Sequence, residues 1–525
     1  MIVIALIIIF VVSLYLYGTR NHTYWLERGV VHEAPLPLFG TEMSRFLMKR
    51  SMAQFAADVY CNHPKERFVG GYRACTPTLV IRDPDLVKRI IVTDFKHFYA
   101  RGFTPAHKWM EPLLRNLFFA DGDLWRLLRQ RMTPAFTSGK LKAMFPLIVE
   151  RAERLQARTL AAAAAGRTLD ARDLMARYTT DFIGACGFGL DADSLNDDDS
   201  EFRKLGAKIL NPTLQRAVVS VFKSIFPSVF KYNKFLGQEL EDDILSLTKQ
   251  IREQRGYKPS GRNDFIDFLL EWQQKGKVTV ESLEKLKADG TPEAVHLELD
   301  DIMVAAQAFI FFVAGFETSS SATSFTLHQL AYHPEVQKKA QDDIDRVLVK
   351  YNGRLSYDAI KEMTYLEWVF MEGMRIFPSS GFLMRECVKK YTIPGTDVTI
   401  DPGVKITVPI QAIQNDPLYF ENPSEFRPER FSPEEVAKRH KFVYLPFGDG
   451  PRICIGARLG QMQSLAGLAA VLAKFTVSPT PETRRELISD PRSTIVQNII
   501  GGIPLSFTER TAIAVSLDDE NKRSQ

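Results

Sequence analysis

Apolar side chains fill the first seventeen positions of the chain, MIVIALIIIFVVSLYLY, with no charged residue among them. As a helix this stretch would measure about 25 Å at ~1.5 Å per residue, slightly less than the ~30 Å hydrocarbon core of a bilayer. A cleaved signal peptide is the competing interpretation, but it needs a basic start and a small-residue cleavage site, which this stretch lacks. We therefore expect residues 1–19 to form an N-terminal transmembrane anchor.

The charges that follow the anchor indicate its orientation. Arg20, Arg28, Lys49 and Arg50 all lie on its C-terminal side, and positively charged flanks tend to stay in the cytosol. The sequence therefore predicts a single anchor with a body that faces the cytosol. The glycosylation acceptor at Asn21 should then stay unmodified.

The pattern of apolar positions changes several times along the rest of the chain. Residues 20–40 include EAPLPLFG, which predicts a stiff proline-containing hinge. Runs of β-branched residues separated by turns predict small sheets at about 68–91 and 391–408. From about residue 105 to 385 the apolar spacing is helical, except for a polar stretch from Gln273 that predicts an exposed loop. These patterns predict a mainly α fold with minor β-sheets.

Size and composition fit one large domain. The chain has 525 residues, and its 67 Lys and Arg against 63 Asp and Glu leave a net charge of only +4. This balance does not support nucleic-acid binding. Five cysteines, an odd number, fit a reducing compartment better than a disulfide framework. We expect a catalytic domain over residues 41–515 and a polar tail over residues 516–525.

The decapeptide FGDGPRICIG places Cys454 in a turn too rich in glycine and proline for a helix or a strand. The residues after it repeat apolar positions at helical spacing. A thiol before a helix start faces unpaired N–H groups and the positive end of the helix dipole, which favour the metal-binding thiolate. A buried free cysteine is the alternative, but it would not need this density of glycine, proline and arginine. The turn therefore predicts a metal site with one thiolate ligand.

The same decapeptide resembles the haem-binding loop of the cytochrome P-450 family, with Phe447, Gly450, Arg452, Cys454 and Gly456 at its motif positions. The resemblance implies a cytochrome P-450 fold and a haem cofactor (heme b, iron protoporphyrin IX). It makes Cys454 the proximal iron ligand, as expected for this class, and it places Phe447 in the cofactor-binding loop.

Upstream, AGFETS in a long apolar run is similar to the family's central helix, which crosses the distal face of the haem. The resemblance makes Glu317 and Thr318 the catalytic acid–alcohol pair and suggests that Gly315 leaves room for dioxygen. The residues alone leave another interpretation open, in which Thr318 bonds back to its own helix and Glu317 is solvated.

Two further motifs resemble parts of the family that hold the haem and its surroundings. Glu372 and Arg375 form an ExxR pair, which in the family is buried and joins an arginine from a later proline-rich loop. FRPERF supplies that loop here, with Arg430 as the third member. By itself, the three-residue spacing is equally typical of an ordinary surface ion pair. The resemblance implies that all three residues are structural.

A second set of residues corresponds to family positions that bind the haem propionates. Trp125 and Arg129 in WRLLR lie four apart and share one helix face. Arg385 and Arg452 occupy two further propionate-binding positions. Cationic partners are physically required, because haem carries two carboxylates into a mostly apolar slot.

The chain departs from the family in two segments that usually line the substrate pocket. The two divergent segments read IFPSSGFLMREC, after Arg375, and QNIIGGIPLSF, near the C-terminus. We expect Phe309, Phe312 and Phe382 to face the substrate, although each could instead belong to the core. Residues 101–109 would form part of the pocket roof.

The segment from Val218 to Phe235 mixes aromatic residues with lysines. Interfacial membrane contact over a substrate entrance is one interpretation. A buried pair of helices around a turn at Pro227 is the other.

The resemblance extends over roughly residues 25–510 and is greatest to microsomal insect enzymes that oxidise foreign and lipophilic compounds. It implies a monooxygenase at the endoplasmic reticulum membrane that inserts one oxygen atom of O2 into a lipophilic small molecule. The chain has no GxGxxG nucleotide loop, so a membrane-bound NADPH-dependent flavoprotein reductase would supply electrons, with cytochrome b5 as an optional partner. A basic patch would receive such an acidic partner; its predicted members are Arg126, Arg131, Lys140, Lys142, Lys441 and Arg458.

Two other functions stay open on the same haem assignment. One is a reductase-independent isomerase or dehydratase that rearranges a peroxide, and relatives of this kind often lose the acid–alcohol pair. The other is a haem protein that binds gas or carries electrons without turnover.

Overall fold

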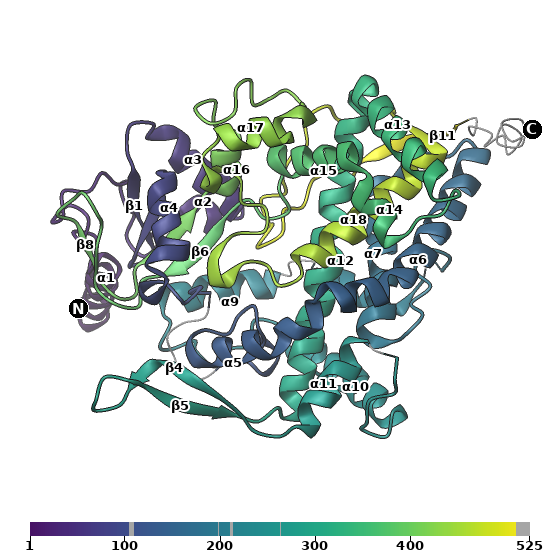
Figure 1. The fold of residues 1–525 in the computed structure, drawn as a ribbon. Coiled ribbons are helices and arrows are strands. Elements are labelled where there is room, and N and C mark those ends of the chain that lie inside the picture. The colour runs from purple at the N-terminus through teal and green to yellow at the C-terminus, as the bar shows by residue number, and fades with distance from the viewer. Residues whose placement is uncertain (104–109, 198, 211–213, 263, 511–525) are drawn as a thin grey trace, which may run out of the picture.

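The computed structural model describes residues 1–103, 110–197, 199–210, 214–262 and 264–510 of the chain. They form a mainly helical body with small sheets (Figure 1), so the predicted fold class is confirmed. The predicted polar tail 516–525 and most of the predicted pocket roof, residues 104–109, lie outside the described residues.

The longer helices are α1 (Ile2–Thr19), α3 (Met52–Asn62), α5 (Gly122–Met132), α6 (Ser138–Ala164), α7 (Ala171–Ile183), α8 (Glu201–Leu210), α9 (Leu214–Ile225), α10 (Gln238–Gln254), α11 (Phe265–Gln274), α12 (Asp301–Tyr332), α13 (Pro334–Lys350), α15 (Thr364–Ile376) and α18 (Ala457–Lys474). Shorter ones are α2 (Met43–Phe46), α4 (Pro84–Lys88), α14 (Tyr357–Glu362), α16 (Ile410–Gln414) and α17 (Pro433–Lys438).

Helix α12 crosses the centre of the body and packs against α7, α15 and α18. It begins where the Asp300 side chain accepts a hydrogen bond of 2.6 Å from the Met303 N–H, which satisfies one of the free donors of the first turn. A Cβ added to Gly315 would lie only 2.2 Å from Cδ1 of Ile183 on α7. The glycine therefore allows α12 and α7 to approach each other, which differs from the predicted role of leaving room for dioxygen.

Strands from the two predicted β regions meet in one sheet of four strands, in the order β1 (Phe68–Arg73), β2 (Thr76–Ile81), β9 (Lys405–Val408) and β6 (Leu383–Glu386); β6 lies just before the second predicted region. β1 pairs antiparallel with β2, β2 parallel with β9, and β9 antiparallel with β6. Smaller sheets contain β10 (Phe475–Pro479), β11 (Pro504–Glu509) and β3 (Leu169–Asp170), and β7 (Tyr391–Thr392) with β8 (Thr399–Ile400).

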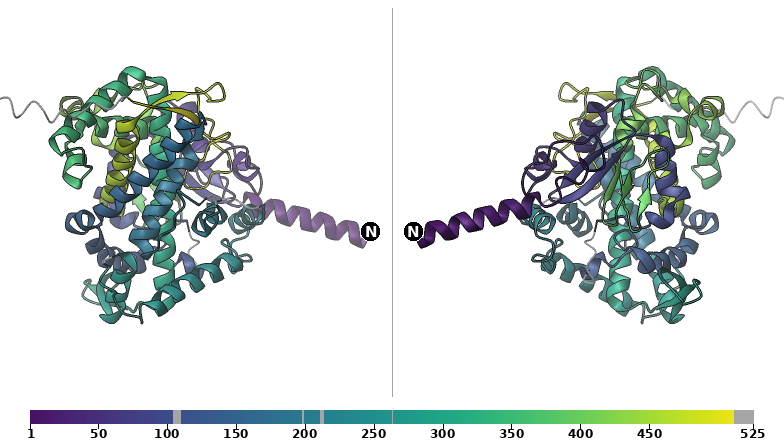
Figure 2. Two further views of the ribbon diagram at one scale, coloured as in Figure 1. Left: turned by 90° about the vertical axis from the view of Figure 1, so that its right-hand side faces the viewer. Right: turned by 90° about the vertical axis from the view of Figure 1, so that its left-hand side faces the viewer.

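Helix α1 projects away from the body (Figure 2), and Gly18 is its one buried residue. α1 and α12 are the two described helices that are long and apolar enough to cross a membrane. Because α12 is mostly enclosed by protein, it is a core helix. The exposed α1 is therefore the membrane-anchor candidate, in agreement with the prediction.

The segment after the anchor is packed firmly on the sheet. Trp25 is 0 % exposed, and its indole N–H donates to the Gly71 carbonyl oxygen at 2.9 Å. A Cβ on Gly70 would come within 2.7 Å of the Trp25 ring. The domain boundaries at residues 19, 40 and 515 stay predictions, but the expected hinge at 20–40 is fixed to the body by this tryptophan.

The polar stretch after α11, predicted to be an exposed loop, is a hairpin of β4 (Val278–Leu286) and β5 (Pro292–Leu297). Buried and exposed side chains alternate along the start of β4, which is the period of a half-buried strand. The hairpin is tied to α5, because Ser282 Oγ and Leu283 N–H donate to Asp123 at 2.6 and 2.5 Å. The loop prediction was wrong because the charged residues of this stretch obscured its two-residue alternation.

Candidate active site

The cysteine turn has a backbone that requires glycine. Gly450 has φ +74°, and a Cβ there would lie 2.0 Å from the Ile91 carbonyl oxygen, so no other residue fits without movement. The Cys454 N–H donates to the Phe447 carbonyl oxygen at 2.9 Å, which closes the turn. The Cys454 side chain is exposed and stands just before the first turn of α18.

The position before α18 does not by itself make Cys454 a thiolate. The Cys454 side chain is accessible but lies in a hollow surrounded by protein, and this desolvation raises the pKa of its thiol, while the Gly456 N–H, Arg101 and Arg129 lower it by less. The stabilisation of the thiolate that the helix start predicts is therefore weaker than the effect of desolvation, which favours the neutral thiol. A coordinated metal cation deprotonates such a thiol outright, so this cysteine is better suited to a metal ligand than to a free nucleophile.

Arg452 is buried beside the cysteine and links the turn to the start of α5. Its guanidinium donates to the carbonyl oxygens of Tyr99 and Ala120 at 2.8 and 3.0 Å, and to Asp121 Oδ1 at 2.7 Å. It also lies over the Trp125 ring, 4.3 Å from the centroid. Trp125 therefore packs against the arginine that the family motif assigns to the cofactor.

Two more arginines lie in the same buried region. Burial and the nearby charge of Arg101 lower the pKa of Arg385 to about 9, and burial lowers the pKa of Arg101 to about 10. The Arg385 Nε atom is buried and has no hydrogen-bond partner among the described residues. Both shifts come mainly from burial, and for Arg385 the neighbouring positive charge of Arg101 adds to it.

This cluster fits the haem cofactor. Asp121 is the carboxylate that accepts from Arg452 and from the Arg101 backbone N–H, and it balances only part of the charge of the buried Arg385 and Arg452 and the half-buried Arg101. Buried charges need partners, and the two haem propionates would supply the missing ones. The sequence analysis did not identify Arg101 or Asp121 as members of this cluster. The position of Asp121 just before the predicted WRLLR helix could have indicated it.

Arg129 lies on the same side of α5 as Trp125 but has a different contact. Its Nη1 donates to the Ile453 carbonyl oxygen at 2.8 Å, next to Cys454. It therefore fixes α5 to the cysteine turn, and burial lowers its pKa while Cys454 raises it.

The acid–alcohol pair on α12 has two different environments. The Thr318 hydroxyl donates to the Ala314 carbonyl oxygen at 2.7 Å, as in the alternative interpretation of the sequence. Glu317, in contrast, is buried and forms an ion pair with Arg172 on α7. The solvated glutamate of that interpretation is therefore not what the structure contains.

Ile310, Ala314 and Thr318 follow one another at four-residue spacing and so share one face of α12. Ala314 is exposed and the other two are half-buried, whereas the residues around them are largely buried. This face is the accessible part of the central helix. Ile310 and Ala314 were missed, although counting back by four from Thr318 would have found them.

The three predicted substrate phenylalanines lie in the core. Phe309, Phe312 and Phe382 are all buried, and the Phe312 ring packs against the rings of Phe188 and Phe316 at centroid distances of 6.0 and 5.1 Å. The structure therefore gives Phe312 a packing role, and it does not bring the three rings together with the accessible face of α12.

Glu372, Arg375 and Arg430 form a buried charge cluster. Arg375 Nε and Nη2 donate to the two Glu372 carboxylate oxygens at 2.7 and 3.0 Å, and Arg430 Nε lies 3.3 Å from Glu372 Oε1. Arg375 also donates to the carbonyl oxygens of Gln414 and Pro423. The cluster thereby joins α15 to the chain that leads into the cysteine turn.

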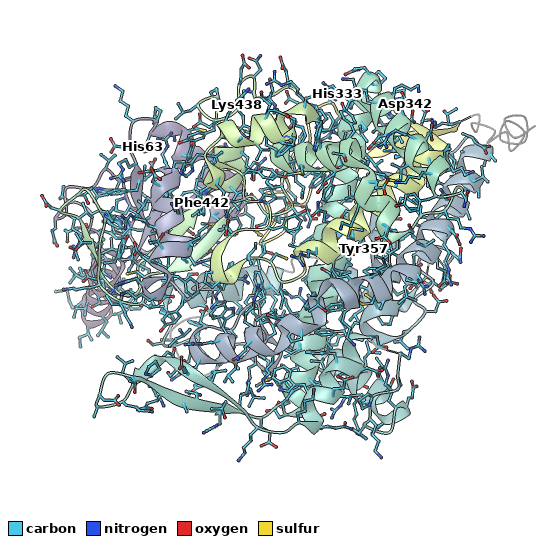
Figure 3. The ribbon with its side chains drawn as sticks, viewed as in Figure 1. His63, His333, Asp342, Tyr357, Lys438 and Phe442 are labelled. Atoms are coloured by element: carbon cyan, nitrogen blue, oxygen red, sulfur yellow. The ribbon has the colours of Figure 1, made fainter. Side chains whose placement is uncertain are left out.

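The residues of the predicted basic patch lie on several elements. Arg458 on α18 donates to Ser138 Oγ on α6 at 3.1 Å, while Lys142 pairs with Asp358 at 2.8 Å, close to the Tyr357 ring labelled in Figure 3. Lys441 pairs with Asp449 at 2.7 Å and Arg126 with Glu281 of the hairpin at 3.3 Å. Arg131 and Lys140 are the remaining predicted members. Much of this positive charge is thus paired within the chain.

A single cysteine on a glycine-rich turn, beside a buried arginine cluster and a central helix with an accessible alanine–threonine face, defines the haem-thiolate class of proteins. The chain belongs to the cytochrome P-450 family, whose sequence pattern matches residues 32–503. It is a haem protein with monooxygenase activity typical of that family.

Individual relatives support the same assignment. Cytochrome P-450 6a2 of Drosophila melanogaster is 39 % identical over 503 residues, which cover 94 % of this chain and 96 % of the relative. Cytochrome P-450 6B6 of Helicoverpa armigera is 36 % identical over 518 residues, with 97 % and 99 % covered, and cytochrome P-450 6k1 of Blattella germanica is 35 % identical over 509 residues, with 96 % of each covered. The predicted family and its resemblance to insect enzymes are confirmed.

Proposed function

We propose that this chain inserts one oxygen atom from O2 into lipophilic substrates, either xenobiotics or endogenous lipids and hormones, with electrons from an NADPH-dependent flavoprotein reductase. The observation that carries the proposal is the position of Cys454 relative to the Thr318 face of α12. Helix α18, which starts behind Cys454, packs on α12 so closely that a Cβ on Gly460 would lie 3.6 Å from Ser319 Oγ. The predicted proton relay therefore lies on α12, and the predicted iron ligand lies just before the start of its neighbour α18.

The protein groups have separate tasks in this mechanism. Haem bound through the Cys454 thiolate would supply the activation of O2. Cys454 would hold the cofactor, and the arginine cluster of Arg101, Arg385 and Arg452 would orient it by its carboxylates. Glu317 and Thr318 would hold and deliver the protons that the reaction consumes.

Substrate preference would be set by the two segments in which the chain departs from its family. They are hydrogen-bonded to each other, since the Gln497 N–H donates to the Ser379 carbonyl oxygen and its Nε2 to that of Pro378, both at 2.8 Å. Ser379 Oγ in turn donates to the Thr318 carbonyl oxygen at 2.7 Å. The divergent segments are therefore next to the proposed proton relay, where a bound substrate would be oxidised.

Turnover is expected to require both O2 and added reductase. The measurement is a screen of lipophilic compounds with the full-length protein and reductase in lipid vesicles, in which product and NADPH consumption are followed together. Equal activity on an organic peroxide without any electron donor would favour the isomerase alternative. Electron uptake without product from any compound would favour a haem protein that does not turn over.

Thr318→Ala is expected to keep haem but to lower the product formed per NADPH by about 100-fold, the lower end of a lost proton-transfer contribution. The missing reducing equivalents should appear as hydrogen peroxide. The measurement is the ratio of product to peroxide, with Thr323→Ala as the matched control, because Thr323 also bonds back within α12, to Ser319. Unchanged coupling in Thr318→Ala would remove Thr318 from the relay.

We also propose that α1 anchors the protein in the endoplasmic reticulum membrane and that the body faces the cytosol. Tyr17 near the end of α1 stacks on Phe226 at 5.3 Å between centroids, and the adjoining segment exposes Phe222, Val229 and Tyr232. These apolar side chains lie where the anchor meets the body, which favours the interfacial interpretation of the Val218–Phe235 segment. Asn21 donates its amide to the Cys75 carbonyl oxygen at 2.9 Å, which is consistent with an unglycosylated side chain.

A further inference from the structure

Arg172, in the first turn of α7, connects three parts of the molecule that are far apart in the sequence. Its Nη2 donates to the Glu317 carboxylate on α12 and, from the same nitrogen, to Asn498 Oδ1 at 2.8 Å. Its Nη1 donates to Ser321 Oγ at 2.5 Å and to Ser320 Oγ at 3.2 Å. The Arg172 side chain is 14 % exposed and that of Glu317 5 %, so the ion pair is largely sheltered from water.

The ion pair decides where the Glu317 carboxylate points. Adjacent residues of an α-helix are rotated by about 100°, since one turn takes ~3.6 residues. Arg172 holds Glu317 against α7, while the hydroxyl of Thr318 bonds to its own helix. Among the described residues no hydrogen bond joins the two side chains, so the acid must leave Arg172 before it can serve the alcohol.

The C-terminal loop reaches both members of the pair through two consecutive residues. Asn498 contacts Arg172, which holds Glu317. Gln497 contacts Ser379, which donates to the Thr318 carbonyl oxygen. The loop that would meet the substrate is thus linked to the groups that would deliver protons through one intermediate residue each, Arg172 and Ser379.

We propose that Arg172 is a positioning residue for Glu317 and that Asn498 sets how firmly Arg172 holds it, so that contact of a substrate with the C-terminal loop regulates proton delivery. This inference rests on the proposed monooxygenase function. The guanidinium is suited to the task because its rigid fork satisfies Glu317, Asn498 and two serines at once. If Asn498 moves away, the Arg172 Nη2 atom loses one of its two hydrogen-bond acceptors. Its remaining bond, to the Glu317 carboxylate, then holds Glu317 less firmly.

The test uses the full-length enzyme with reductase and a substrate from the screen, and it measures hydrogen peroxide formed per NADPH. Asn498→Ala should lower this ratio about 2- to 10-fold, a size typical of residues that act through a neighbour, because Glu317 leaves a loosened Arg172 more readily and reaches the alcohol. Asn498→Asp keeps the shape of the side chain but adds a second carboxylate that competes with Glu317 for Arg172, so its effect should be larger. An effect of Asn498→Asp no larger than that of Asn498→Ala would overturn the inference.

A double-mutant cycle shows whether the effect passes through Glu317. In a Glu317→Gln background, Asn498→Ala should have no further effect on the peroxide ratio. Asn196→Ala is the matched control, because Asn196 also donates its amide to a carboxylate, that of Asp193 at 2.6 Å, on the surface. For each variant, the absorption band of the reduced protein under carbon monoxide reports whether haem is retained.

The outcomes separate the two proposals. If the wild type forms no product with O2 and reductase, the proposed function fails and this inference falls with it. If the wild type forms product but Asn498→Ala leaves the ratio unchanged, or changes it equally in the Glu317→Gln background, only the role of Arg172 and Asn498 is overturned.

Discussion

Cys454→Ala is expected to lose nearly all bound haem, together with the strongly red-shifted absorption band of the reduced protein under carbon monoxide. The thiolate is the one covalent protein ligand that the motif assigns to the iron. The arginine cluster can hold the propionates but cannot replace the iron–sulfur bond. The measurement is haem content per protein and the carbon monoxide difference spectrum.

Cys61→Ala is the matched control for this prediction. Cys61 is the other exposed cysteine and lies on α3, away from the turn, so its removal should leave the spectrum unchanged. A Cys454→Ala protein that keeps the red-shifted band would refute the ligand assignment. A histidine-type spectrum in the wild type would do the same.

Glu372→Gln is expected to lower the free energy of unfolding by about 3–5 kcal/mol, because it leaves two buried arginines without their counter-charge. Arg375 and Glu372 are both 0 % exposed, and Arg430 is nearly as buried. Arg375→Lys should also destabilise the protein, since a lysine keeps the charge but cannot donate to Glu372 and to the carbonyl oxygens together. Urea titration followed by haem absorbance measures the change; the half-life at a fixed temperature replaces it if unfolding is irreversible.

Glu429→Gln provides the comparison on the surface. Glu429 pairs with Lys339 at 2.8 Å, with both side chains exposed, and such pairs contribute about 0–1 kcal/mol. If Glu372→Gln cost no more than Glu429→Gln, the buried cluster would not have the structural role proposed for it.

The local motifs could be predicted because each one lies within a few residues of sequence. The cysteine turn, the ExxR pair and the apolar anchor all depend on short spacings. The partners of these motifs could not be found in this way. Asp121 and Arg452 are 331 residues apart, and Arg172 and Glu317 are 145 apart, so only the folded chain brings them together.

The errors have equally local causes. Helix α12 carries apolar and small residues on all sides, as a buried helix does, so its pattern does not indicate which residues are accessible. That pattern did not indicate Ala314, whereas Phe312, which the structure buries among other rings, stays a substrate prediction. The β4–β5 hairpin was taken for a loop because its buried positions include Ser282, a polar residue whose hydroxyl bonds to Asp123.

The burial of Trp25 decides where the chain can be shortened for expression without its anchor. A start near residue 20 removes α1 and keeps the tryptophan in its place on β1. A start at residue 41 would remove Trp25 and expose the side of β1 on which it packs. The loss of this aromatic ring would lower the free energy of unfolding by about 3–5 kcal/mol. Soluble forms of this enzyme for crystallisation should therefore begin just after the anchor, with the proline-containing segment retained as part of the folded body.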